Sequence, residues 1–141
     1  MELTSPHQKE PFKAIIDRYE RAFLERDLAA FRTLHVRDGG LVFFDNHSGC
    51  DSASYEDHEV KIAAFFKTGA IVGLRRENVR VFVAGDMACV TATHRYLSRP
   101  VPGVRTTYVF EREEGEWRIR HMHHSFDPNE SEPVRAATSG E

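Results

Sequence analysis

The chain has 141 residues, of which 40% are hydrophobic, 11% aromatic and 29% charged, and its formal net charge is −3. This length and composition are those of a single globular domain with its own core, and they exclude a disordered chain. The weakly acidic balance excludes a nucleic-acid surface, because phosphate binding needs a concentrated excess of Lys and Arg.

The N-terminus shows no signal-peptide pattern, and no apolar run approaches the length that spans a bilayer. We therefore expect a cytoplasmic protein that has no membrane partner. The two cysteines, Cys50 and Cys89, are too few for a disulfide framework or a zinc site, which agrees with a reducing compartment.

Helical patterns dominate the first half of the chain. Apolar residues recur at spacings of three and four over residues 11–26, which predicts one long helix, and residues 1–10 are expected to be an N-terminal extension. Asp27 is a candidate N-cap of a second, shorter helix, and residues 41–44 are an apolar strand. Ser54 offers capping chemistry for a third helix that ends at Gly69, with a buried side expected at Val60, Ile62, Phe65 and Phe66.

The second half of the chain alternates at period 2, as strands do. Residues 71–84 and 87–97 form two strands joined by a tight turn at Gly85-Asp86, and a proline-rich loop at 100–103 precedes a closing hairpin whose turn is Glu114-Gly115. Residues 128–141 are expected to be a mobile tail. The sequence therefore predicts a single α+β domain over residues 11–127, in which a curved antiparallel sheet wraps the first helix as a cone.

The last predicted strand changes character along its length. Strict alternation would place Trp117, Ile119, His121, His123 and Ser125 on one face, so this face passes from apolar side chains to imidazoles. A pocket wall has this form, because its apolar end packs in the core and its polar end meets a ligand. We expect the pocket at the open end of the cone.

Several stretches resemble the nuclear transport factor 2-like superfamily, and within it the SnoaL-like domains and the association domain of calcium/calmodulin-dependent protein kinase II. They are GDMAC at 85–89, TTYVFEREEGEWRIRHMHHS at 106–125, the RDLAAF corner at 26–31 and the GLVFFD strand at 40–45. The resemblance implies a cone-shaped, cystatin-like fold and a homodimer formed through the open sheet face. It implies no reaction, since the superfamily holds isomerases, cyclases, dehydratases and non-catalytic scaffolds.

The resemblance also implies positions for functional residues. His94 and Tyr108 stand where the kinase association domains carry pocket arginines, so carboxylate binding of that kind is not expected. The resemblance is to the association domain alone, and we expect no kinase activity. Tyr19 and Asp45 stand where the steroid isomerases of the superfamily carry a tyrosine and a basic carboxylate. The second acid of those enzymes would fall near Thr107, so half of their set of catalytic residues is missing here.

Asp45, Tyr19 and His121 are the candidate catalytic residues. Asp45 follows a buried strand and is either a base whose pKa burial raises or a turn residue bonded to loop amides. Tyr19 is either a hydrogen-bond donor to a substrate oxygen or the tip of a core aromatic. His121 is assigned to the pocket, and the opposite parity of His124 assigns that residue to solvent or a partner chain.

The candidate ligand-binding residues are Phe43, His94, Tyr96, Tyr108, Phe110 and His123. For His123 a place at a dimer interface is the competing interpretation. We expect no cofactor and no metal, because an i, i+2 histidine pair without a third ligand is a common accident. Three functions remain open: a dimeric domain that binds a small organic molecule, a proton-transfer enzyme with Asp45 as base, and an oligomerisation scaffold with an unused cavity.

Overall fold

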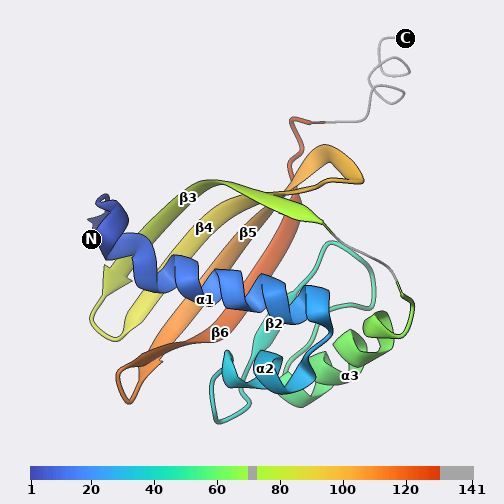
Figure 1. Ribbon diagram of the computed structural model, residues 1–141, viewed down its shortest axis with the longest axis horizontal. Helices are drawn as coiled ribbons and strands as arrows, with labels where there is room; N and C mark the ends of the chain where they lie inside the picture. Colours follow the sequence, from blue (N-terminus) through green and yellow to red (C-terminus); the bar gives the residue numbers. More distant parts are fainter. Residues whose placement is uncertain (70–72, 131–141) are drawn as a thin grey trace.

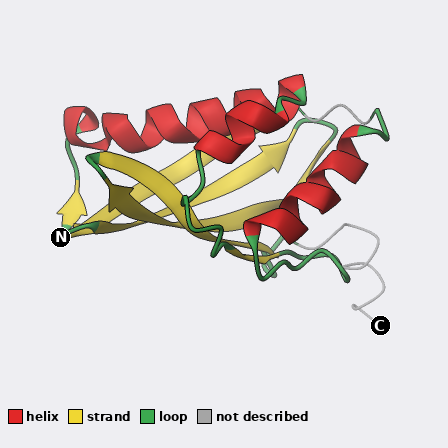
Figure 2. Ribbon diagram, turned by 90° about the horizontal axis from the view of Figure 1, so that it is seen from below, coloured by secondary structure: helices red, strands yellow, loops and turns green. Residues whose placement is uncertain are grey.

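The computed structural model describes residues 1–69 and 73–130. These residues form three helices beside one six-stranded sheet, and the long helix α1 crosses the strands from one edge toward the other (Figure 1). Figure 2 shows α1 lying along one face of the curved sheet, as predicted. The elements in chain order are β1 (Glu2–Leu3), α1 (Pro6–Glu25), α2 (Leu28–Thr33), β2 (Val42–Phe44), α3 (Tyr55–Phe66), β3 (Leu74–Ala84), β4 (Met87–Tyr96), β5 (Arg99–Glu113) and β6 (Glu116–Phe126).

Residues 1–10 take part in the fold. Helix α1 begins at Pro6 instead of residue 11, because the Ser5 side chain accepts a hydrogen bond from Gln8 N and caps the helix there. Before the helix, Glu2–Leu3 pairs with β3 and adds a strand to the sheet edge. Of the expected tail, residues 131–141 lie outside the described residues, whereas the Glu130 carboxylate binds the Arg95 guanidinium and Gly103 N.

The buried stripe of α1 holds the helix on the sheet. Phe12, Ile15 and Ile16 are buried, and the Phe12 ring lies 5.7 Å from Phe110 and 5.1 Å from Trp117. The sheet is antiparallel in the predicted order, with both predicted turns in place, and β2 joins its far edge parallel to β6. The face against α1 is therefore concave and apolar at this end.

The capping predictions for α2 and α3 are confirmed, but the buried side of α3 differs from the prediction. Asp27 accepts from Ala30 N, and Ser54 accepts from Asp57 N. Val60 is 69% exposed, whereas His58 is 1% exposed. The stripe that enters the protein runs through Tyr55, His58, Ile62 and Phe66, at spacings of three and four, so a polar residue occupies a position where an apolar one was expected.

The prediction of a loop at residues 100–103 is wrong, because these residues belong to β5. The turn is shorter, at Leu97-Ser98, and β5 begins at Arg99. Pairing runs from His94↔Val104 directly to Tyr96↔Arg99, so the prolines lie in a bulge. Proline is tolerated there because it has no N–H to give to the ladder.

A second bulge, in β6, decides which side chains enter the cone. Phe110 pairs with Ile119, and the preceding residue of β5, Val109, pairs with His121. Arg120 therefore has no partner in β5 and is the extra residue. An extra residue reverses the alternation beyond it. Met122 and His124 consequently follow Ile119 on the concave face, and His121 and His123 turn to the outer face.

Candidate functional site

Polar side chains from several elements lie near one another in the concave interior beyond the apolar core. Tyr19 comes from α1, Asp45 from the loop after β2, and Tyr96 from the end of β4. The pKa of the Tyr19 hydroxyl is raised, mainly by burial and then by nearby Tyr96, Tyr55 and Asp45. Burial and Asp45 also raise the pKa of Tyr96, so both tyrosines stay neutral donors close to one carboxylate.

Two histidines, the buried His58 and the half-buried His124, are within the electrostatic influence of the same carboxylate. Burial lowers the pKa of His58 on α3 and of His124 on β6 to about 4, and Asp45 opposes this shift at both rings. Both imidazoles are therefore neutral at pH 7, and each has one donor and one acceptor nitrogen. In the described structure His58 Nε2 is buried without a hydrogen-bond partner.

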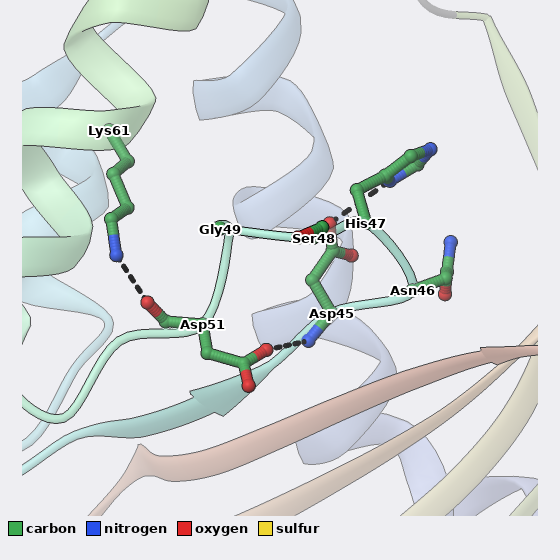
Figure 3. Close-up of a pocket in the computed structure, with 7 residues that line it drawn as sticks. All are labelled: Asp45, Asn46, His47, Ser48, Gly49, Asp51 and Lys61. Atoms are coloured by element: carbon green, nitrogen blue, oxygen red, sulfur yellow. Dashed lines mark hydrogen bonds and ion pairs between the residues drawn. The ribbon is translucent and has the colours of Figure 1, made fainter.

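Asp45 itself lies at the boundary between this interior and the surface. Its side chain is 17% exposed, its Oδ2 atom lies 3.1 Å from His47 Nδ1, and its backbone N–H donates to Asp51 Oδ1 at 2.9 Å. This loop lines an open hollow of about 540 Å³. Figure 3 shows the residues of the loop around it, with Lys61 approaching from α3. Lys61 is engaged by the Asp51 carbonyl and by Asp57, so it fixes the loop that presents Asp45.

A hydrogen-bonded line extends the site across the sheet. The Thr106 hydroxyl on β5 lies 2.9 Å from His94 Nδ1 and 2.9 Å from His124 Nδ1. On its other side, His94 Nε2 lies 3.3 Å from the Tyr108 hydroxyl. Burial raises the pKa of Tyr108, which keeps this hydroxyl a donor. Buried polar groups of adjacent strands thus satisfy one another in a single network.

Six of the nine predicted site residues line or border the interior, and three do not. Tyr19, Phe43, Asp45, His94, Tyr96 and Tyr108 line or border the interior. Phe110 is fully buried between Phe12 and Tyr108 and belongs to the core. His121 and His123 are not in the interior: His121 Nδ1 bonds the Val42 carbonyl at 2.7 Å, and both rings pack beside Phe44 on the outer face.

Sequence reasoning missed His58, Thr106 and His124. His58 could have been found, because it falls on a 3-4-4 stripe with Tyr55, Ile62 and Phe66. His124 could not, because its inward direction depends on the bulge at Arg120. Thr106 could not have been found either, because its role depends on its contacts with His94 and His124 in the folded structure.

The outer sheet face has its own shallow hollow, of about 460 Å³. It is lined mainly by polar and basic side chains: Asn78, Arg80, Thr91, Ala92, Thr93, Arg105, Thr106, Thr107, His123 and Ser125. Exposed apolar side chains stand on the β2 side of this face, where Val42 is 37% and Phe44 43% exposed.

Within the described part of the chain, no three His, Cys, Asp or Glu side chains are grouped as metal ligands would be. None of the described helices is both long enough and apolar enough to cross a bilayer.

The comparisons with known proteins agree on one family. The family model described as the SnoaL-like domain matches residues 13–128. A nuclear transport factor 2-like protein of unknown function from Pseudomonas putida KT2440 superposes with a TM-score of 0.74 at 19% identity, covering 87% of this chain and 89% of that chain.

Two further structures resemble the chain. A candidate calcium/calmodulin-dependent protein kinase type II association domain from Thiobacillus denitrificans is 18% identical, with a TM-score of 0.71, and 82% of this chain and 94% of that chain are covered. A candidate dehydratase of the same superfamily from Streptomyces avermitilis is 20% identical, also with a TM-score of 0.71, and 87% and 99% are covered. No curated protein sequence matches the chain. At these identities the structures share the fold, and the matching domain model places the chain in the SnoaL-like family of the nuclear transport factor 2-like superfamily.

Proposed function

We propose that this domain binds a small organic molecule in the concave interior between Asp45 and the neutral side chains of Tyr19, His58, Tyr96 and His124. The observation that carries the proposal is His58 Nε2, which is buried without a hydrogen-bond partner in the described structure. Such a group costs about 1–3 kcal/mol. A ligand oxygen or nitrogen that pairs with it would recover this free energy.

The surroundings suggest the chemistry of the ligand. The Phe43 ring packs 4.5 Å from His58 and 5.3 Å from His124, and the Tyr19 ring packs 4.7 Å from Phe31. Aromatic walls with a few convergent polar groups are typical of sites for flat, largely apolar molecules. The ligand we expect carries at least one carbonyl or hydroxyl group, which meets the neutral donors.

Native mass spectrometry of the protein purified without added ligand tests this proposal. We expect a small molecule that is released on denaturation, and we expect Asp45→Asn or His58→Leu to reduce its occupancy. Glu56→Gln, which removes a charge from the exposed first turn of α3, is the matched control and should retain the molecule. A protein that binds nothing, even from a panel of aromatic carbonyl compounds, would contradict the proposal and favour an oligomerisation scaffold.

A second candidate function is proton transfer next to a carbonyl group, with Asp45 as the base. It is favoured by the grouping of one carboxylate with hydroxyls that stay protonated, which separates the base from the donors that would stabilise an enolate. In this proposal His124 takes the place in the pocket that was expected for His121. The test is deuterium uptake by the released molecule in D2O, which Asp45→Asn should abolish; equal uptake with the variant would refute this role.

We further propose a homodimer formed through the outer sheet face. Exposed Val42 and Phe44 stand there beside the shallow hollow, and burying them would stabilise association. Sedimentation velocity should show a dimer that Phe44→Glu dissociates. Val60→Glu, at the exposed apolar residue of α3, is the control and should leave the dimer intact. Dissociation by both variants, or by neither, would contradict an interface on this face.

A further inference from the structure

A continuous line of hydrogen-bonding groups crosses three strands of the sheet. His94 on β4 and His124 on β6 each place Nδ1 2.9 Å from the Thr106 hydroxyl on β5. Beyond His94, the Oε1 atom of Glu20 on α1 lies 3.5 Å from His94 Nε2. A carboxylate thus lies near the His94 end of the line, and its other end reaches the interior site at His124.

Counting protons restricts the states of this line. The Thr106 hydroxyl has one proton, so it can donate to only one imidazole and has to accept from the other. In the first arrangement His94 donates from Nδ1, Thr106 donates to His124 Nδ1, and the His124 proton is on Nε2. In the second arrangement His124 donates from Nδ1, Thr106 donates to His94 Nδ1, and the His94 proton is on Nε2. The two histidines are opposite tautomers in both arrangements.

A carboxylate acts on each end of the line. Glu20 Oε1 is buried and has no hydrogen-bond partner in the described structure, and it favours a proton on His94 Nε2. Asp45 is the carboxylate that acts on His124. Because Thr106 holds Nδ1 of that ring, Asp45 favours a proton on Nε2. The two acids therefore favour opposite arrangements.

Other charged and polar groups also lie near the two ends of the line. Arg76 Nε lies 3.5 Å from Glu20 Oε1, and Tyr108 donates to His94 Nε2 only in the first arrangement. At the other end, besides burial, the charges of His58 and His123 lower the pKa of His124, whereas Asp45 raises it. None of these groups interrupts the path through Thr106.

We infer that His94, Thr106 and His124 form a proton relay between the interior site and Glu20. When His124 Nε2 accepts a proton, its Nδ1 proton passes to Thr106, the Thr106 proton passes to His94 Nδ1, and the His94 Nε2 proton passes to Glu20 Oε1. Each bond to hydrogen that breaks is matched by one that forms, and both imidazoles end neutral. The use of this relay on a bound molecule rests on the proposed function, whereas its existence does not.

Imidazole ¹⁵N chemical shifts at neutral pH, which separate the two tautomers, test the relay in the unliganded protein. We expect His94 and His124 to be opposite tautomers, or both averaged with complementary populations. Glu20→Gln should move the population toward the first arrangement and Asp45→Asn toward the second. Both rings in the same tautomer, or shifts of the same sign in the two variants, would overturn the relay.

Two matched controls separate the relay from a general electrostatic effect. Asp17→Asn removes an acid that contacts Arg76 from the same helix but is 51% exposed, and it should leave both tautomers unchanged. Thr106→Ser should preserve the complementary populations, whereas Thr106→Val should uncouple them. Opposite tautomers in a protein that binds no molecule would refute the proposed function alone, and identical tautomers in a protein that binds one would refute the relay alone.

Discussion

Thr106→Val removes the central hydroxyl of the histidine network and keeps its shape. Thr106 is 1% exposed, and its oxygen serves two imidazole nitrogens at 2.9 Å. Valine fills the same volume, so no cavity opens, but two hydrogen bonds of about 1 kcal/mol each are lost, and buried nitrogens remain without partners. We expect the free energy of unfolding to fall by about 2–4 kcal/mol.

Thr106→Ser is the comparison that makes this prediction sharp. Serine keeps the hydroxyl and loses one methyl group, which costs about 1 kcal/mol in a buried position. Urea denaturation followed by circular dichroism gives both values, and we expect valine to destabilise the protein more than serine does. The reverse order would mean that the hydroxyl is idle and would refute the network.

Two further predictions concern the buried histidines and Tyr19. Burial lowers the pKa values of His35, His58 and His124 to about 3, 4 and 4, so the unfolded chain, titrating near pH 6.5, binds more protons below that pH. Stability should therefore be greatest above pH 6.5 and fall by up to about 1.4 kcal/mol per pH unit for each histidine between pH 6.5 and 4; equal urea midpoints at pH 7 and pH 5 would contradict this. Tyr19→Phe keeps the ring contacts and loses the hydroxyl. The loss of one hydrogen bond of about 1 kcal/mol should raise the Kd of the released molecule about fivefold, as measured by calorimetry. An unchanged Kd would place the hydroxyl outside the site.

The sequence predicted those parts of the fold that local chemistry determines. Asp27 and Ser54 are short polar residues before apolar stripes, and each caps the predicted helix. Gly85 and Gly115 adopt positive φ in tight turns, a conformation that glycine adopts without strain. Together with the alternating strands, these signals were sufficient for the α+β cone.

The candidate site was predictable only where alternation was unbroken. Tyr19 and His94 follow regular segments and their side chains are buried on the concave side, whereas Asp45 lies at the boundary with the surface. The bulge at Arg120 depends on contacts distant in sequence, since its guanidinium binds Asp38 and Glu111. One extra residue exchanged His121 for His124, and no period-2 reading of β6 could reveal it.

The most direct test of the account is an NMR titration of the histidine side chains in the wild-type protein and in Asp45→Asn. The account predicts that His58 and His124 stay neutral down to about pH 4, and that loss of the Asp45 carboxylate lowers both pKa values further. His124 titrating near pH 6.5, or both values unchanged in the variant, would contradict an interior site built around Asp45.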